Sequence, residues 1–426
     1  MRALGNMETA LNLTDRFSPL NLVSVARLSD GPSPAALRQA LDALQARRPE
    51  LRVGIGRRGR EFVFQPAGPT PIPLSIVTGP SGDDWQAVVE RELNTRLPAS
   101  TGPLARCVYL YDPQPGAPSD VVLTLQHTIV DGDAVLGLWR ELLSLAAGLP
   151  MEGAARTDLP PPSEQLYPPR FRGLRRARVI ARFMAAQMSA ELAYQLQLRG
   201  GRRPPLHSSA RNQILARRLP APATRALVRR CRAERVTLHS ALGAAALLAL
   251  QQRLYAGRPL TLRGITFGSL RAHLQPPVAE AEPGCHIAML RYSVELAAVQ
   301  PFWPLARRIQ QLIDQLARRD ERFAAQALAP MLIDSTNRLQ KLRLAHTALS
   351  HLGAPTLAEA FGATRVLALH AFVSNHRLGP EYTLTSHLAG DELLLDIVYL
   401  DADLSQAEAL AIASEMENAL QAASQP

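Results

Sequence analysis

Of the residues that could take part in catalysis, His127, at the end of an apolar run, has the most informative sequence context. His127 follows the sequence VVLTLQ, and Asp131 and Gly132 come four and five positions later. The β-branched residues predict a buried strand that ends at His127, and the apolar spacing after Gly132 predicts a helix. An imidazole titrates near neutral pH, so at a strand end facing a cleft it can take a proton from an acceptor hydroxyl and return it. The segment predicts a general base.

Asp131 and Gly132 have supporting roles in this interpretation. Asp131 can hold the loop in shape, and Gly132 permits either a positive φ or a close approach of backbone. The alternative is a core histidine at 127 and an ordinary helix N-cap at 131. The sequence contains no G-x-S-x-G elbow, phosphate-binding loop, dinucleotide fingerprint or H-E-x-x-H zinc motif. A thioester substrate suits a lone base, because a thiol is a good leaving group and no enzyme nucleophile is then required.

Helices and strands alternate on both sides of this motif, which predicts an α/β protein of two similarly built sandwiches. Ser33 and Pro34 have the types expected at the cap and first position of a helix. In the first half we expect strands at 51–55, 61–65, 105–111 and 121–125, and helices from 34, at 84–97 and at 133–145. In the second half we expect strands at 212–219, 260–267, 288–296, 367–374, 382–388 and 393–399, and helices at 221–235, 237–255, 304–319 and 405–422.

The character of the sequence changes between Gly148 and Pro205. Proline-rich stretches flank a segment, residues 170–198, in which an apolar stripe runs beside a cluster of arginines. We therefore divide the chain into a first half at 1–150 that carries the motif, a linker at 151–210 and a second half at 211–426. The basic amphipathic helix of the linker either docks on its own protein or lies at a membrane surface.

The composition excludes several classes of protein. The chain has 426 residues, 47% of them hydrophobic, and a net charge of +10 in which Lys341 is the only lysine. No zinc-finger spacing or RNP-like aromatic run accompanies the arginines, so we expect no nucleic-acid partner. The charge suits coenzyme A phosphates, an acidic carrier protein or anionic lipid. The start, with acidic Glu8 and Asp15, does not resemble a secretory signal, and three scattered cysteines fit a reducing compartment. We expect a cytoplasmic protein, with peripheral contact at the inner membrane face as a further option.

The segment Gln126–Gly132 resembles the H-H-x-x-x-D-G motif of the condensation-domain and alcohol acyltransferase superfamily. This superfamily includes peptide-synthetase condensation domains, wax ester synthases and mycobacterial polyketide-associated acyltransferases, and the chain is most similar to the stand-alone members. Other similar segments are spread over most of the chain: Leu4-Gly5, Pro19–Val23, Leu41–Arg52, Thr237–Leu250, Leu270-Arg271 with Pro276-Pro277, and Phe372–Asn375. The resemblance implies two chloramphenicol-acetyltransferase-like halves in a V-shaped pseudo-dimer, with His127 in the middle of a channel between them.

The resemblance also implies roles for particular residues. The second histidine of the motif is the catalytic one in this superfamily, and it matches His127. The matching aspartate and its arginine partner are Asp131 and Arg271, which we include with His127 in the catalytic set. Gly132 and Asn375 match positions near the substrates.

Two positions depart from the family pattern. Gln126 replaces the first histidine of the motif, which leaves a non-catalytic relative as an alternative. The late strand continues as Ser374-Asn375 and then His376–Gly379, two residues longer than the usual S-N-x-G. This extension puts a substrate-positioning role for Asn375 in doubt. We interpret His239 as a core histidine, and His370, His376 and His387 as structural or surface residues rather than lining of a channel.

Together these features predict an O-acyltransferase. The acyl donor would be a thioester of coenzyme A or of an acyl carrier protein, and the acceptor a hydroxyl of a lipid, polyketide or other small-molecule alcohol. No metal or bound cofactor is expected beyond the thioester. An amide-forming condensation enzyme and a non-catalytic binding relative are the alternatives.

Overall fold

The computed structural model describes residues 1–79, 84–114, 116–151, 155–197, 210–280, 282–339, 343–354 and 357–425. They form two compact units. The first contains Met1–Leu166, Arg271–His286 and Pro355–Ser374, and the second contains Tyr167–Leu270, Ile287–Ala354 and Asn375–Pro426. Each unit is α/β, as predicted. The division proposed at residues 150 and 210 takes no account of the two later segments, which pack within the first unit.

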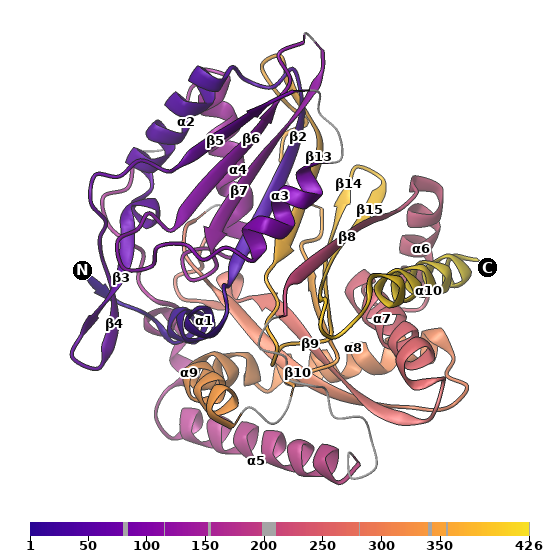
Figure 1. Cartoon of the computed structure of the whole chain (residues 1–426). Coiled ribbons are helices and arrows are strands. Elements are labelled where there is room, and N and C mark those ends of the chain that lie inside the picture. The colour runs from indigo at the N-terminus through magenta and orange to yellow at the C-terminus, as the bar shows by residue number, and fades with distance from the viewer. Residues whose placement is uncertain are drawn as a thin grey trace. The chain divides into compact units, whose positions relative to one another are not determined.

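A six-stranded mixed sheet forms the centre of the first unit (Figure 1). The central strand β7 (Pro118–Gln126) is antiparallel to both neighbours, and all of its residues after Pro118 are buried. The VVLTL run is therefore a strand covered on both faces, as predicted. The order of the sheet is β12 (Ala360–Phe361), β13 (Thr364–Val373), β2 (Asn21–Ser29), β7, β6 (Ala105–Tyr111) and β5 (Leu74–Thr78).

Three helices supply the core around this sheet. Helices α2 (Pro34–Arg47) and α4 (Gly132–Ala146) pack on each other and bury their apolar faces in the core that contains β7. Helix α3 (Asp84–Leu93) packs on β2, β7 and β13. The Ser33 hydroxyl accepts from the backbone N–H of Ala36 with Pro34 at the first position, so the predicted N-cap of α2 is confirmed.

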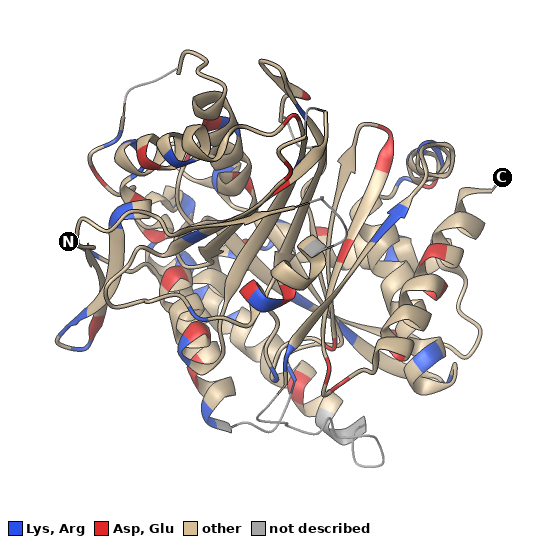
Figure 2. Cartoon of the chain, turned by 45° about the horizontal axis from the view of Figure 1, so that its top comes forward, with Lys and Arg blue, Asp and Glu red and all other residues tan. Residues whose placement is uncertain are grey.

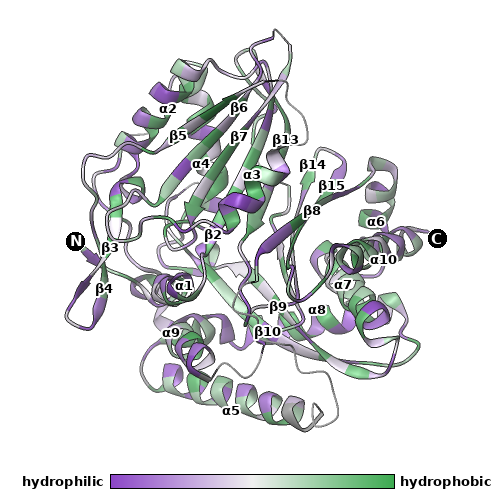
Figure 3. Cartoon of the chain, in the orientation of Figure 1, coloured by the Kyte–Doolittle hydropathy of each residue, from purple (hydrophilic) through white to green (hydrophobic). Residues whose placement is uncertain are grey.

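A second six-stranded sheet forms the centre of the second unit (Figure 1). Helix α7 (Leu238–Tyr255) packs on it and is surrounded by α6 (Ala221–Ala233), α8 (Phe302–Arg318) and α10 (Gln406–Ser424). Hydrophobic residues follow the strands of both sheets and α7 (Figure 3). The order of this sheet is β10 (Ile287–Leu296), β9 (Leu260–Ser269), β11 (Thr347–His351), β14 (Tyr382–Ala389), β15 (Glu392–Leu400) and β8 (Asn212–Leu219). Two separate sheets with their own cores confirm the predicted pair of sandwiches.

Two further helices of the second unit pair outside this core. Helix α9 (Glu321–Leu339) packs on β10, and α5 (Gly173–Gln197) packs on α9. No helix among the described residues combines the length and apolar composition needed to cross a bilayer.

Several elements were not predicted from the sequence, and several predicted boundaries were wrong, among them those of β3 (Val53–Arg58), β7, β13 and α3. The unpredicted elements include α1 (Asn6–Phe17), β2, β5, α9 and β11. Helix α3 ends at Leu93 rather than at residue 97. The Asn94 amide donates to the carbonyl oxygen of Glu90, and the Thr95 hydroxyl to that of Arg91. These side chains bond the last carbonyls of the helix, which favours termination there.

Glu50 provides a test of the buried electrostatics of the first unit. It lies in the 3-10 turn Pro49–Arg52, and its carboxylate oxygens have no hydrogen-bond partner from another described residue. Burial raises its pKa to about 7. A raised carboxyl pKa removes stability as the pH rises from the unfolded value to the folded value, here from about 4.5 to about 7.

We therefore expect Glu50→Gln to gain stability relative to wild type as the pH rises from 4.5 to 8, by about 3 kcal/mol at most. Chemical denaturation at pH 5 and pH 8 measures this difference. Glu61→Gln, at a side chain that is 67% exposed, is the control and should follow wild type. A Glu50→Gln stability difference that is the same at both pH values would contradict the prediction.

Candidate active site

His127 lies directly after β7, where the chain leaves the central sheet and turns toward α4. Its backbone N–H donates to the carbonyl oxygen of Leu20 (3.0 Å), which fastens this strand end to the segment that enters β2. The side chain is 8% exposed. The predicted order of strand, histidine, short loop and helix is confirmed.

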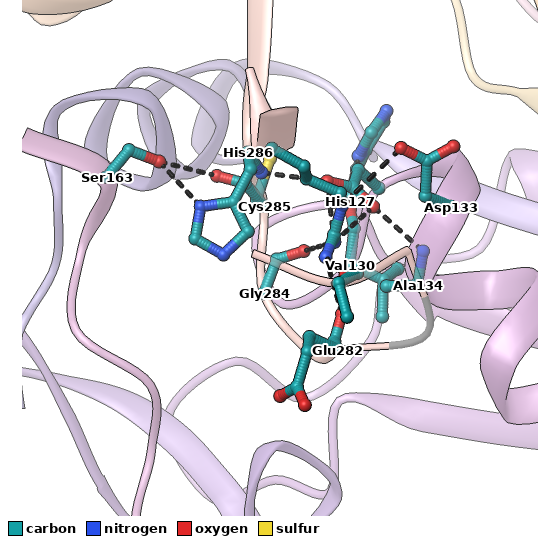
Figure 4. A network of polar contacts seen from close by, with 12 residues as sticks. His127, Val130, Asp133, Ala134, Ser163, Glu282, Gly284, Cys285 and His286 are labelled. Atoms are coloured by element: carbon teal, nitrogen blue, oxygen red, sulfur yellow. Dashed lines mark hydrogen bonds and ion pairs between the residues drawn. The ribbon is translucent and has the colours of Figure 1, made fainter. Parts of the chain in front are cut away.

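The loop sets which ring nitrogen of His127 carries the proton. Nδ1 lies 2.8 Å from the carbonyl oxygen of Val130 (Figure 4). A carbonyl can only accept, so Nδ1 donates, and Nε2 of the neutral ring is left as the basic nitrogen. Burial lowers the pKa of His127 below its ordinary value of 6.5, although the Val130 carbonyl opposes this effect. The ring is therefore neutral at pH 7, with Nε2 able to accept a proton.

Asp131 is buried and fully occupied by donors from three places in the chain. It caps α4 by accepting from the backbone N–H of Ala134 (2.9 Å). Its second oxygen accepts from the backbone N–H of His286 (2.8 Å), and both oxygens accept from Arg271 (2.8 and 3.0 Å). The Asp131–Arg271 pair that the resemblance implies is thus present. With its oxygens bound in this way, Asp131 is suited to hold the loop in place rather than to exchange protons.

Arg271 organises the segment that follows it. Nη1 donates to the carbonyl oxygens of Ala279 (2.9 Å) and Glu282 (2.8 Å), and Nη2 also reaches that of Gly284 (3.1 Å). Nε lies 3.4 Å from Asp133. A guanidinium has five donors in a fixed plane, so one side chain can bind these three carbonyl oxygens and a carboxylate at the same time. Arg271 is 3% exposed.

The same segment contains residues that the sequence analysis missed. His286 is 2% exposed, and its Nδ1 lies 2.9 Å from Oγ of Ser163 (Figure 4). Burial lowers the pKa of His286 to about 4. Gly284 forms an isolated bridge with Val130 and has φ +109°, a conformation that favours glycine. The Gly284–His286 stretch before β10 gave no motif, and its closeness to the 127–132 loop depends on folding.

Gln126 replaces the first histidine of the motif and is the last residue of β7. It is fully buried at the end of β7, where its register partner is Asn21 of β2. Burial raises the pKa of Asp15 in α1. The backbone N–H of Leu20, which donates to this carboxylate, opposes the rise most, and the nearby Gln126 side chain also opposes it. Successive residues of a strand face opposite sides, so position 126 serves the packing against α1 while position 127 serves the site.

The side chains of Ser374 and Asn375 form hydrogen bonds with backbone groups. Ser374 Oγ donates to the carbonyl oxygen of Leu93 (2.8 Å). Asn375 Nδ2 donates to the carbonyl oxygen of Pro380 (2.6 Å), and its Oδ1 accepts from the backbone N–H of His376 (2.9 Å). A Cβ on Gly379 would lie 2.2 Å from Asn375 Oδ1, so this turn requires glycine. Both ends of the Asn375 amide therefore serve its own extended turn, and its predicted substrate-binding role gains no support from the geometry.

The remaining residues singled out in the sequence include Gly132, His239 and His370. Gly132 is the first residue of α4 and is not among the residues with positive φ, so the first reason suggested for a glycine there does not apply. His239 Nε2 lies 2.6 Å from Oγ1 of Thr266, as expected for a satisfied core histidine. His370 stacks on Trp85, with 4.9 Å between the ring centroids. Among the described residues, no group of three or more His, Cys, Asp or Glu side chains could hold a metal ion.

The Asp131–Arg271 pair can be tested by stability. Removing one partner leaves the other charge buried and uncompensated, so we expect Arg271→Leu to lower the free energy of unfolding by about 3 to 5 kcal/mol. The matched control is Arg58→Leu, because Arg58 and Glu61 form a pair in which both side chains are 67% exposed. That change should cost less than about 1 kcal/mol. Urea denaturation of both variants measures the difference, and similar losses would contradict the assignment.

Comparisons with known proteins give a consistent fold. Residues 208–354 match the family model of the phthiocerol/phthiodiolone dimycocerosyl transferase C-terminus. No curated protein matches the chain in sequence. Solved structures that resemble this chain over nearly its whole length include these three. Polyketide synthase associated protein 5 from Mycobacterium tuberculosis is 16% identical with TM-score 0.67 and 98% of each chain covered. The trichothecene 15-O-acetyltransferase from Fusarium sporotrichioides is 14% identical with TM-score 0.76, covering 100% of this chain and 96% of that one. The first condensation domain of the CDA synthetase is 16% identical with TM-score 0.70, also covering 100% and 96%.

Proposed function

We propose that this chain, which has the fold of the condensation-domain and alcohol acyltransferase superfamily and matches one of its family models, forms an ester from an acyl thioester and an alcohol. The family model matches residues 208–354, which lie outside the motif, and the solved structures share the fold. Both findings support an acyltransferase or condensation enzyme. The observation that carries the proposal is the tautomer of His127, in which Nδ1–H is bound by Val130 and Nε2 is the basic nitrogen.

The reaction would use His127 twice. Nε2 takes the proton of the acceptor hydroxyl while the oxygen forms a bond to the thioester carbonyl carbon. The tetrahedral intermediate then collapses with cleavage of the carbon–sulfur bond, and Nε2–H returns its proton to the departing thiolate. The lowered pKa of His127 favours the neutral base at the start of each cycle. Asp131 and Arg271 act in this proposal as positioning residues, because their polar atoms bind the loop itself.

The donor is a thioester of coenzyme A or of an acyl carrier protein, as a co-substrate rather than a bound cofactor. The acceptor in this proposal is a hydroxyl of a lipid, polyketide or other small-molecule alcohol. The trichothecene enzyme is by its name an O-acetyltransferase, which is in line with an ester product. Amide formation is the second candidate, because a condensation domain has a similar fold.

Loss of the base should abolish product. Purified wild type and His127→Ala would be offered pooled acyl thioesters with pooled alcohols and amines, and products read by mass spectrometry. We expect acylated alcohol from wild type and a loss of at least about 100-fold in the variant, the size usual for a general base. His273→Ala, which removes an exposed histidine, is the control and should retain product.

Three other outcomes have distinct meanings. Equal product from wild type and His127→Ala would remove His127 from the mechanism. Loss of product in Ser163→Ala with retention in His127→Ala would assign the reaction to the Ser163–His286 pair instead. Exclusive acylation of amines would contradict ester formation.

The pH dependence follows from the burial of His127. Only the neutral ring accepts a proton, and the pKa is lowered from 6.5. Activity should therefore persist as the pH falls below 6.5 and decline only as the folded-state pKa is approached. We expect the acidic limb of kcat/KM against pH to have its midpoint below 6.5. A midpoint at 7 or higher would show that another group controls the reaction.

A further inference from the structure

We propose that the outward face of α5 binds an anionic membrane surface. This face is the stripe of exposed residues Leu174, Ala181, Ala185, Met188 and Leu192. The helix lies against α9 within the second unit (Figure 1).

The opposite face of α5 is already used for docking. Val179 and Phe183 are buried, at 6% and 4% exposure. Glu191 accepts from Arg263 (2.9 Å), and the Arg263 guanidinium lies 3.7 Å from the ring centroid of Tyr194. These contacts fix the rotation of α5 on its own unit. A helix docked in this way needs one apolar face, so a second apolar face on the solvent side calls for a separate explanation.

The outward stripe is regular. Its residues are separated by seven, four, three and four positions, the spacing that places side chains on one line of an α-helix. Leu174, Met188 and Leu192 are 79%, 66% and 62% exposed, and they are three of the eleven large hydrophobic side chains recorded as exposed in the described part of the chain. At 1.5 Å per residue the line from 174 to 192 extends about 27 Å. Hydrophobic and hydrophilic segments alternate along α5 (Figure 3).

The charges beside the stripe are strongly basic. Residues 170–182 and 318–322 contain nine arginines and only two acids, Asp320 and Glu321. Asp320 is already engaged by Arg170 and Arg175, and Glu321 by Arg182. Among the described residues, the exposed side chains of Arg172 and Arg178 have no ion-pair partner. Basic residues also occur on many other elements (Figure 2), but here they accompany exposed leucine and methionine.

This combination favours a lipid surface over an acidic protein. An interfacial helix lies in the plane of the bilayer, with apolar side chains among the acyl chains and arginines at the level of the phosphates. The stripe has this form, with Arg178 on the same line between Leu174 and Ala181 and the other arginines beside it. Charge attraction to an acidic protein would require the arginines but not the exposed Leu174, Met188 and Leu192.

Vesicle flotation with the full-length chain tests the proposal and needs no turnover. Vesicles would contain phosphatidylcholine alone or with about 30 mol% phosphatidylglycerol, which gives the surface a negative charge. We expect binding to the anionic vesicles only. The apolar variant Leu174→Gln/Met188→Gln/Leu192→Gln and the charge variant Arg172→Gln/Arg178→Gln should each weaken binding about tenfold or more.

The control variants change exposed residues on other elements. Leu149→Gln/Val299→Gln/Leu367→Gln changes three other exposed hydrophobics, and Arg60→Gln/Arg232→Gln changes two other exposed arginines. Both should bind as wild type does, and thermal melting verifies that every variant is folded. Absence of binding to anionic vesicles at low salt would overturn the proposal. The proposal would also be overturned if the apolar variant bound anionic vesicles as strongly as wild type, because charge attraction alone would then explain the binding. A third contradicting result would be binding of an acidic carrier protein through α5 without any binding of vesicles.

Discussion

The carboxylate of Asp131 joins the start of α4 to Arg271 and His286, which are 140 and 155 positions later in the sequence. It caps α4, accepts the backbone N–H of His286 and binds the guanidinium of Arg271. A buried carboxylate requires such partners, because an unpaired charge in a low-dielectric interior is very costly. The positions of Arg271 and His286 beside the 127–132 loop therefore depend on one carboxylate. That constraint also fixes the loop in which His127 lies.

The loop in turn controls the chemistry available to His127. Because Val130 accepts from Nδ1, the ring presents Nε2 as its base, and burial keeps the ring neutral. Val130 is itself held by a bridge to Gly284, whose carbonyl oxygen accepts from Arg271. The tautomer of one histidine is thus connected through backbone to the Asp131–Arg271 pair. Gln126, at the position of the first histidine of the motif, takes no part in these contacts.

The shared fold does not by itself identify the reaction. Structures named as an O-acetyltransferase and as a condensation domain are similar to this chain at nearly equal sequence identity. A base and a held loop serve attack by an oxygen or by a nitrogen equally well. The acceptor is decided by side chains around the substrate rather than by the sheets. Ester formation is therefore our proposal for this chain and not a property of its fold.

The sequence by itself determined the local features: the buried strand before His127, the capped helices α2 and α4, and the two series of strands. These follow from periodicity and capping, which act over a few residues. The resemblance added the pairing of Asp131 with Arg271. Only the tertiary structure placed His286 and Ser163 beside the motif and occupied the Asn375 amide within its own turn. It also left Leu174 of α5 exposed. The Ser163–His286 contact joins residues 123 positions apart, for which no local pattern exists. The Asn375 contacts are local, but they depend on an extended turn that the sequence pattern did not predict.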